Sequence, residues 1–204
     1  LFLNVNGKFK SFNLPEVVQF TPTFGIAVED FDLDGSLDIA LCQGFAGFYG
    51  NDEPQTNTSN LILLNRIAAG GSFEVRRNSG TVANSTYPRI IGSGDFNEDN
   101  RPDLVIPDYN GGVRCYTNKT KNQGIKLRLN GDSTKLIGLK ARLRYKDGRK
   151  GPMYEYVPKY GYRKEAPKYF IFGACVTVEA IEIIDRDTLR ELKIVPDRST
   201  YSWN

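Results

Sequence analysis

The most regular feature of the chain is the alternation of apolar and polar residues in its C-terminal part. Every second residue of the segment 125–129 is apolar, and the segment 137–145 repeats this period of two. Such a period is typical of a β-strand that buries one face. Asp147-Gly148, which follows the second segment, predicts a hairpin turn. Further strands are expected at residues 169–172, 176–184 and 189–195.

The earlier part of the chain contains repeated patterns. Residues 25–41 and 92–106 are two copies of one pattern, in which a short apolar stretch, an acidic run and a second apolar stretch follow one another. A second similarity joins residues 1–9 to residues 62–73. No segment shows a convincing helical period, so we expect an all-β chain that starts inside a repeat whose beginning is missing.

The acidic run of each copy has the pattern of a cation-binding loop, and we call the two runs loop 1 (residues 30–38) and loop 2 (residues 95–103). Positions 1, 3, 5 and 9 are Asp30, Asp32, Asp34 and Asp38 in loop 1, and Asp95, Asn97, Asp99 and Asp103 in loop 2. The position-7 carbonyls belong to Ser36 and Arg101. Ca²⁺ takes six to eight oxygen ligands, which alternating carboxylates on a tight turn supply. We therefore predict two calcium sites, the tighter one at loop 1 with its four aspartates.

Two alternatives to this interpretation exist. An EF-hand requires a glutamate at position 12 and a following helix. Position 12 is Leu41 in loop 1 and Ile106 in loop 2, and Pro107 opposes a helix there. A solvated acidic turn is the other alternative, but four neighbouring carboxylates repel one another without a cation. Two loops with the same offsets favour calcium held between two strands.

Loops 1 and 2 resemble FG-GAP/VCBS repeats, the β-propeller-type units that are also found in integrin α chains. Phe24-Gly25 suits the Phe-Gly part of that name. The segment from about residue 123 onward resembles the ASPIC/UnbV domain of cartilage acidic protein-like chains. The Ile-Gly-Ala strand start of that domain corresponds to residues 137–141, and its Phe-Gly-Leu-Gly step corresponds, in degraded form, to residues 170–173.

These resemblances imply a fold and a domain division. Residues 1–122 would form partial β-propeller-type FG-GAP/VCBS repeats with calcium sites, the first unit being incomplete. Residues 123–204 would form a small ASPIC/UnbV-like β-sandwich or β-barrel-like domain. The families also imply a secreted or surface-attached protein with an adhesive or matrix role and no established catalytic residues.

The expected function is therefore that of an extracellular, calcium-stabilised structural or adhesion module. It would bind a protein or glycan partner, or other copies of itself as a subunit of a larger assembly or filament. The alternative is a propeller-scaffold enzyme of the lyase or dehydratase type that acts on a carbohydrate. The chain has no histidine, which excludes a Ser-His-Asp triad and a His-ligated zinc or iron site. Carboxylate or Tyr/Lys chemistry stays open.

The net charge of +3 conceals an uneven distribution, because the repeats are acidic and residues 126–168 are strongly basic. The basic side chains of the two alternating segments are candidates for binding an anion or a partner: Lys126, Arg128, Lys140, Arg142 and Arg144. A solvated outer sheet face is the simpler interpretation. An acidic glycan or the acidic surface of another subunit is the alternative, and nucleic acid is not expected because the rest of the chain is acidic.

Some smaller features complete the predictions. Sequons at Asn57, Asn84 and Asn118 are candidate glycosylation sites. Three cysteines, Cys42, Cys115 and Cys175, allow either one disulfide and a free thiol or three buried thiols. No CxxC motif points to a structural zinc site. No apolar run approaches the ~18 residues of a membrane span, so none is expected.

Overall fold

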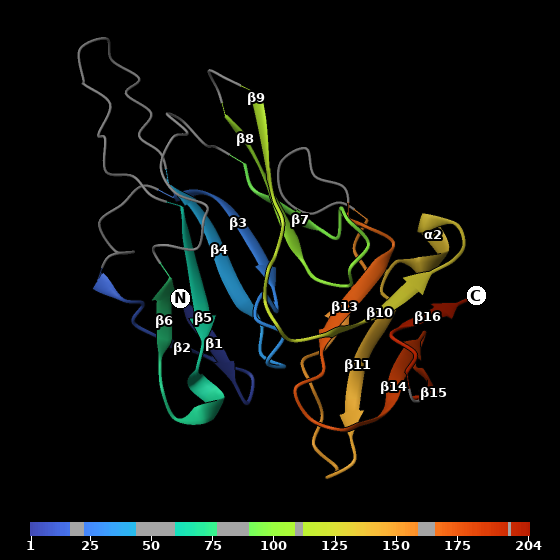
Figure 1. The fold of residues 1–204 in the computed structure, drawn as a ribbon. Coiled ribbons are helices and arrows are strands. Elements are labelled where there is room, and N and C mark those ends of the chain that lie inside the picture. The colour runs from blue at the N-terminus through green and yellow to red at the C-terminus, as the bar shows by residue number, and fades with distance from the viewer. Residues whose placement is uncertain (17–22, 44–59, 77–89, 109–111, 159–165, 196) are drawn as a thin grey trace, which may run out of the picture. The chain divides into compact units, whose positions relative to one another are not determined.

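The computed structural model describes residues 1–16, 23–43, 60–76, 90–108, 112–158, 166–195 and 197–204. These residues form mainly β-structure in five small sheets with one short α-helix (Figure 1), and no propeller is detected among them. The all-β class predicted from the sequence is confirmed. The chain divides into two compact units. The first comprises Leu1–Ala27, Ile39–Ile91 and Ile106–Arg114, and the second comprises Val28–Asp38, Gly92–Val105 and Cys115–Asn204.

Three small sheets contain the repeated patterns. Strands β1 (Phe2–Val5) and β2 (Lys8–Ser11) form an antiparallel hairpin. A four-stranded sheet has the order β3 (Thr23–Glu29), β4 (Asp38–Gln43), β5 (Leu61–Asn65) and β6 (Phe73–Arg76), with the 3-10 helix η1 (Ile67–Ala69) between its last two strands. A three-stranded sheet has the order β7 (Gly92–Gly94), β8 (Asp103–Asp108) and β9 (Gly112–Tyr116). Chain order equals sheet order in all three, so the two larger sheets are meanders.

Each acidic loop occupies the same place in its meander. Loop 1 connects β3 to β4 and loop 2 connects β7 to β8, and in both the position-9 aspartate is the first residue of the following strand. The core of the four-stranded sheet is formed by Leu41, Leu61, Leu63 and Phe73. Removing such apolar side chains from water is the main contribution to the stability of a small sheet.

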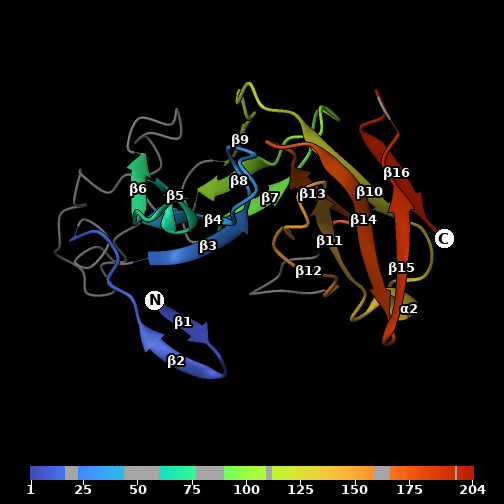
Figure 2. The same cartoon turned by 90° about the horizontal axis from the view of Figure 1, so that it is seen from below.

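The remaining strands form two further sheets, both in the second unit. One has the order β13 (Tyr169–Gly173), β10 (Gly124–Leu129) and β16 (Thr200–Trp203), and β10 runs antiparallel to β13 but parallel to β16. The other has the order β12 (Tyr154–Glu155), β11 (Lys140–Tyr145), β14 (Val178–Asp185) and β15 (Thr188–Lys193). Figure 2 shows β14 and β15 side by side, as their antiparallel pairing requires.

The period of two appears directly in the core of the second unit. Ile125, Leu127 and Leu129 of β10 are buried in one cluster with alternate residues of β11 and β14. The turn predicted at Asp147-Gly148 is confirmed, because the Gly148 N–H donates to the carbonyl of Tyr145 at 2.9 Å.

The structure differs from the sequence prediction before β11. The strand expected from residue 137 begins at Lys140, and a short helix, α2 (Ser133–Leu136), precedes it. Asp132 caps this helix by accepting a hydrogen bond from the Thr134 N–H at 2.9 Å. Gly138 then has a φ of 79°, which a strand does not allow. No helix in the described ranges is long and apolar enough to cross a membrane.

Candidate metal centre

Loops 1 and 2 share one backbone frame, held by the carboxylate at position 1. In each loop this carboxylate accepts hydrogen bonds from the backbone N–H groups of positions 5 and 6. The acceptors are Asp30 and Asp95, and the donors are Asp34 (2.9 Å), Gly35 (2.8 Å), Asp99 (3.0 Å) and Asn100 (2.9 Å). One buried carboxylate thus satisfies two N–H groups that a tight turn leaves without strand partners.

The carboxylates at positions 9 and 5 complete the frame. Position 9 accepts a hydrogen bond from the N–H of position 2 at 2.9 Å in both loops, and position 5 accepts one from the N–H of position 7 at 2.8–3.0 Å. Positions 4 and 6 have positive φ in both loops; they are Leu33, Gly35, Glu98 and Asn100. Asn100 can replace Gly35 because asparagine tolerates the left-handed region better than most residues. The equal offsets in the sequence therefore correspond to equal conformations.

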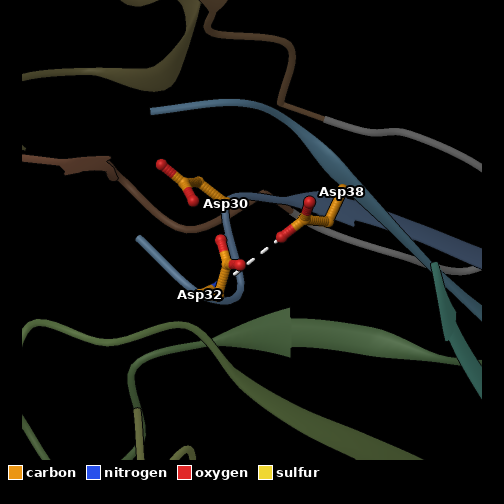
Figure 3. Close-up of side chains that lie close together, drawn as sticks. All are labelled: Asp30, Asp32 and Asp38. Carbon is orange, nitrogen blue, oxygen red and sulfur yellow. Dashed lines mark hydrogen bonds between the residues drawn. The ribbon is translucent and has the colours of Figure 1, made fainter. Parts of the chain in front are cut away.

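Three carboxylates of loop 1 converge. Asp30, Asp32 and Asp38 each offer one oxygen, and these oxygens all lie within 4.8 Å of one another. Figure 3 shows the three side chains around the turn that loop 1 makes. Calcium–oxygen bonds of 2.3–2.6 Å place two ligands on opposite sides of one ion about 5 Å apart, so all three oxygens can reach a single calcium ion. The donor set of loop 1 therefore fits calcium.

The charge of loop 1 is the main cost of this arrangement. Asp30 and Asp38 are almost completely buried, at 1% and 0% exposure. Burial raises the pKa of Asp30 to about 8; the Gly35 N–H opposes this shift, and the neighbouring aspartates add to it. A cation would relieve this repulsion. Of the other ligands predicted for loop 1, the Asp34 carboxylate lies outside the converging group and turns one oxygen toward the Ser36 N–H. The Ser36 carbonyl stays a predicted ligand.

Loop 2 has the same frame but different charged contacts. The carboxylate of Asp95 contacts the ammonium group of Lys126 on β10, and the two side chains are 0% and 2% exposed. Asp99 forms an ion pair with Arg101 at 3.2 Å and accepts a hydrogen bond from the side chain of Asn97 at 3.0 Å. The two oxygens of Asp103 accept hydrogen bonds from the N–H groups of Phe96 (2.9 Å) and Asn118 (2.7 Å).

Both loops pack against a pair of glycines that the sequence analysis missed. Gly124 of β10 and Gly173 of β13 are partners in the strand register. A Cβ atom at Gly173 would overlap the carboxylate of Asp30, and one at Gly124 would overlap the carbonyl oxygen of Asn100. Only glycine allows the loops to approach the strands this closely. The sequence signal was present at residues 170–173, but it suggested a domain family and gave no sign of this contact.

Asn118 connects the two loops. Its side-chain amide donates to the carbonyl of Phe31 in loop 1 at 2.7 Å and to the carbonyl of Pro102 in loop 2 at 3.1 Å. Both hydrogens of Nδ2, the atom to which an N-linked glycan would attach, therefore have acceptors within the chain. Glycosylation at Asn118 stays a prediction, and a glycan attached there would have to replace one of these hydrogen bonds. The other two candidate sequons, Asn57 and Asn84, lie outside the described residues.

Every predicted anion-binding residue has a carboxylate partner. The pairs are Lys126–Asp95, Arg128–Glu98 (3.6 Å), Lys140–Glu155 (3.6 Å), Arg142–Glu182 (2.8 Å) and Arg144–Glu191 (2.6 Å). Lys126 was expected on an outer face, but the structure buries it at 1% exposure because loop 2 covers this part of β10. Glu182 is also buried, at 2% exposure, and has Lys150 as a further partner at 3.3 Å. Binding of an external anion by the exposed members of the set stays a prediction.

The three cysteines are not joined by a disulfide. Cys42 is buried, whereas Cys115 and Cys175 are exposed. Neither alternative that the sequence left open, one disulfide with a free thiol or three buried thiols, is therefore found. The Cys175 thiol donates a hydrogen bond to the carbonyl of Asp34 at 2.7 Å, beside loop 1.

No protein-family model matches the chain, and no curated protein matches it either. A functional interpretation therefore depends on the geometry of the two loops.

The paired glycines give a first testable prediction. Gly173→Ala should lower the free energy of unfolding by about 1–3 kcal/mol, because the added methyl group must push loop 1 away from β13. Gly124→Ala should have a similar cost through loop 2. Urea denaturation of both variants measures these costs. Wild-type stability of both variants would contradict the described packing of the loops.

The buried carboxylate on β14 gives a second prediction. Glu182→Gln should lower the free energy of unfolding by about 1–3 kcal/mol, because it weakens the charged hydrogen bonds of a buried group. The matched control is Glu155→Gln on β12, whose side chain is 48% exposed with its Lys140 partner at 3.6 Å. Such an exposed pair contributes only about 0–1 kcal/mol. Equal losses in urea denaturation would show that burial of Glu182 does not matter.

Proposed function

We propose that the chain is a non-enzymatic, calcium-stabilised β-repeat module that binds a protein or glycan partner outside the cell. The observation that carries this proposal is the convergence of Asp30, Asp32 and Asp38 on a loop whose backbone frame recurs at loop 2. Calcium bound there would offset two of the three negative charges and relieve the repulsion among the carboxylates. The carboxylates of Asp30 and Asp38 would then hold the turn in two ways: they accept hydrogen bonds from backbone N–H groups, and they would coordinate the ion.

The strand order supports the repeat interpretation. The sheet β3–β6 is a four-stranded meander with an acidic loop between its first two strands, and β7–β9 repeats the first three strands with the same loop. Propeller blades are four-stranded sheets. The hairpin β1–β2 matches β5–β6, the last pair of the meander, in the sequence similarity between residues 1–9 and 62–73. We propose partial FG-GAP/VCBS-type repeats at 1–122, followed by an ASPIC/UnbV-like domain at 123–204.

The calcium ion would act through contacts that loop 1 makes elsewhere in the second unit. The carboxylate of Asp30 lies against Gly173 of β13, and the carbonyl of Phe31 accepts the hydrogen bond from Asn118. A loop fixed by calcium would hold both contacts in place. The role of the ion is therefore structural, and binding would be carried out by the surface that the ordered strands present.

The extracellular location and the class of partner rest on the family resemblance. An adhesive or matrix role fits a module whose order depends on calcium, and other copies of the chain are included among its partners. A filament is one form of this proposal, because the strands at sheet edges can pair with another chain.

The carbohydrate lyase or dehydratase alternative requires an acid and a base in a cleft. The carboxylates at positions 1 and 9 of loops 1 and 2 accept hydrogen bonds from backbone N–H groups. In the described part of the chain, the hollow beside loop 1 is lined by side chains such as Leu143, Tyr154 and Phe172 and is too narrow for a water molecule. These observations favour binding over catalysis.

Removal of calcium tests the proposed function. An ion that binds only the folded state adds about 2.7 kcal/mol at a hundredfold excess over its Kd. For a chain of this size, that corresponds to a Tm higher by roughly 5–10 °C in calcium than in a chelator. Calorimetry in the two buffers measures the shift. A wild-type Tm that does not respond to chelation would contradict calcium binding.

A variant of loop 1 assigns the shift to its site. Asp32→Ala should abolish the calcium-dependent rise in Tm, because position 3 supplies a converging oxygen but takes no part in the hydrogen-bond frame that both loops share. The matched control is Asp185→Ala at the end of β14, which should keep the full shift. An equal calcium response in both variants would place the ion elsewhere.

A further inference from the structure

We propose that the ammonium group of Lys126 supplies the positive charge at loop 2, whereas calcium supplies it at loop 1. The chain would then bind one calcium ion rather than the two that the sequence predicts. The count of one rests on the proposed calcium binding at loop 1, whereas the role of Lys126 is independent of it.

The argument starts from the equality of the two frames. Because the carboxylates at positions 1, 5 and 9 accept corresponding hydrogen bonds in both loops, a difference in cation binding must come from the side chains around the frame. At position 1 of loop 2, one oxygen of Asp95 accepts from both the Asn100 N–H and the Lys126 ammonium group. The carboxylate with the central place in the frame therefore already has a positive partner.

Lys126 sits in a site built to hold it. Its side chain is among the largest that are fully buried in the described residues, and the whole residue is 1% exposed. Its Nζ atom lies 4.9 Å from the centre of the Tyr169 ring, and the Tyr169 hydroxyl accepts a hydrogen bond from the Asp95 N–H at 2.6 Å. A buried ammonium group is costly unless a carboxylate partners it. Lys126 and Asp95 thus neutralise each other away from solvent, with Tyr169 fixing their geometry.

The other ligand positions of loop 2 also disfavour calcium. Position 5, Asp99, pairs with the guanidinium group of Arg101, which also donates to the Thr120 carbonyl at 2.9 Å. Position 3 is the neutral Asn97 in place of an aspartate. Two of the three carboxylates at the predicted ligand positions of loop 2 therefore contact basic side chains. A calcium ion would have to displace a buried ammonium group or bind beside it against its charge.

The decisive measurement counts bound calcium, by equilibrium dialysis, in the wild type and in Asp32→Ala. If Lys126 occupies loop 2, the wild type binds one ion and Asp32→Ala binds none, although loop 2 is unaltered. If the wild type binds two ions and Asp32→Ala retains one, loop 2 takes calcium in the presence of Lys126. The inference is then overturned, while the proposed function stands.

A second measurement tests Lys126 without reference to loop 1. Lys126→Met keeps an unbranched side chain that is only one atom shorter, but it leaves the buried Asp95 carboxylate without its cation. Its Tm should fall by roughly 5–15 °C, in calcium and in chelator alike. The control Lys140→Met removes a lysine that is 44% exposed and should leave the Tm unchanged.

The two measurements separate the two proposals. A wild type that binds no calcium refutes the proposed function, and the melting data alone then decide on Lys126. Equal melting of Lys126→Met and Lys140→Met overturns the inference whatever the calcium count. Failure of Lys126→Met to fold at all would agree with the inference, and the dialysis of Asp32→Ala would still be able to overturn it.

Discussion

Buried carboxylates that accept hydrogen bonds from backbone N–H groups are the constraint on which the rest of this structure depends. A turn of eight residues between two strands leaves several N–H groups without strand partners, and such groups cannot be buried unpaired. Asp30 and Asp95 each satisfy two of them, and Asp38 and Asp103 each satisfy at least one. The frame is stable only if the negative charge that it buries is compensated, so each loop requires a cation or a proton.

This requirement also explains how the second unit is composed. Residues 28–38 and 92–105 group with residues 115–204 rather than with the rest of the repeats. The glycine pair Gly124 and Gly173 lets both loops approach β10 and β13 closely, and Asn118 joins one carbonyl of each loop. The two loops and the C-terminal strands therefore stabilise one another, and a domain boundary placed after residue 122 on sequence grounds stays a prediction.

The sequence predicted what depends on local periodicity and missed what depends on contacts between distant segments. The period of two located β10 and β11, and the spacing of the aspartates located both loops, because strand pleat and turn geometry are local properties. The burial of Lys126 was missed, because alternation shows which residues share a face but cannot show that residues 95–103 will cover it. Helix α2 was missed because a single capping aspartate, Asp132, outweighed the apolar period after it.

The same contacts change the meaning of the basic strands. A row of lysines and arginines on alternating positions suggested a surface for an external anion, yet each of these residues pairs with a carboxylate of its own unit. An incoming anion would have to replace carboxylates that are already held in place by the fold. It would also lose translational and rotational freedom on binding, which these carboxylates do not. At Lys126 it would also have to enter a site closed to solvent. The basic side chains of β10 and β11 therefore pair first with acidic residues of the chain itself, and the contact of Asp95 in loop 2 with Lys126 on β10 is the clearest case.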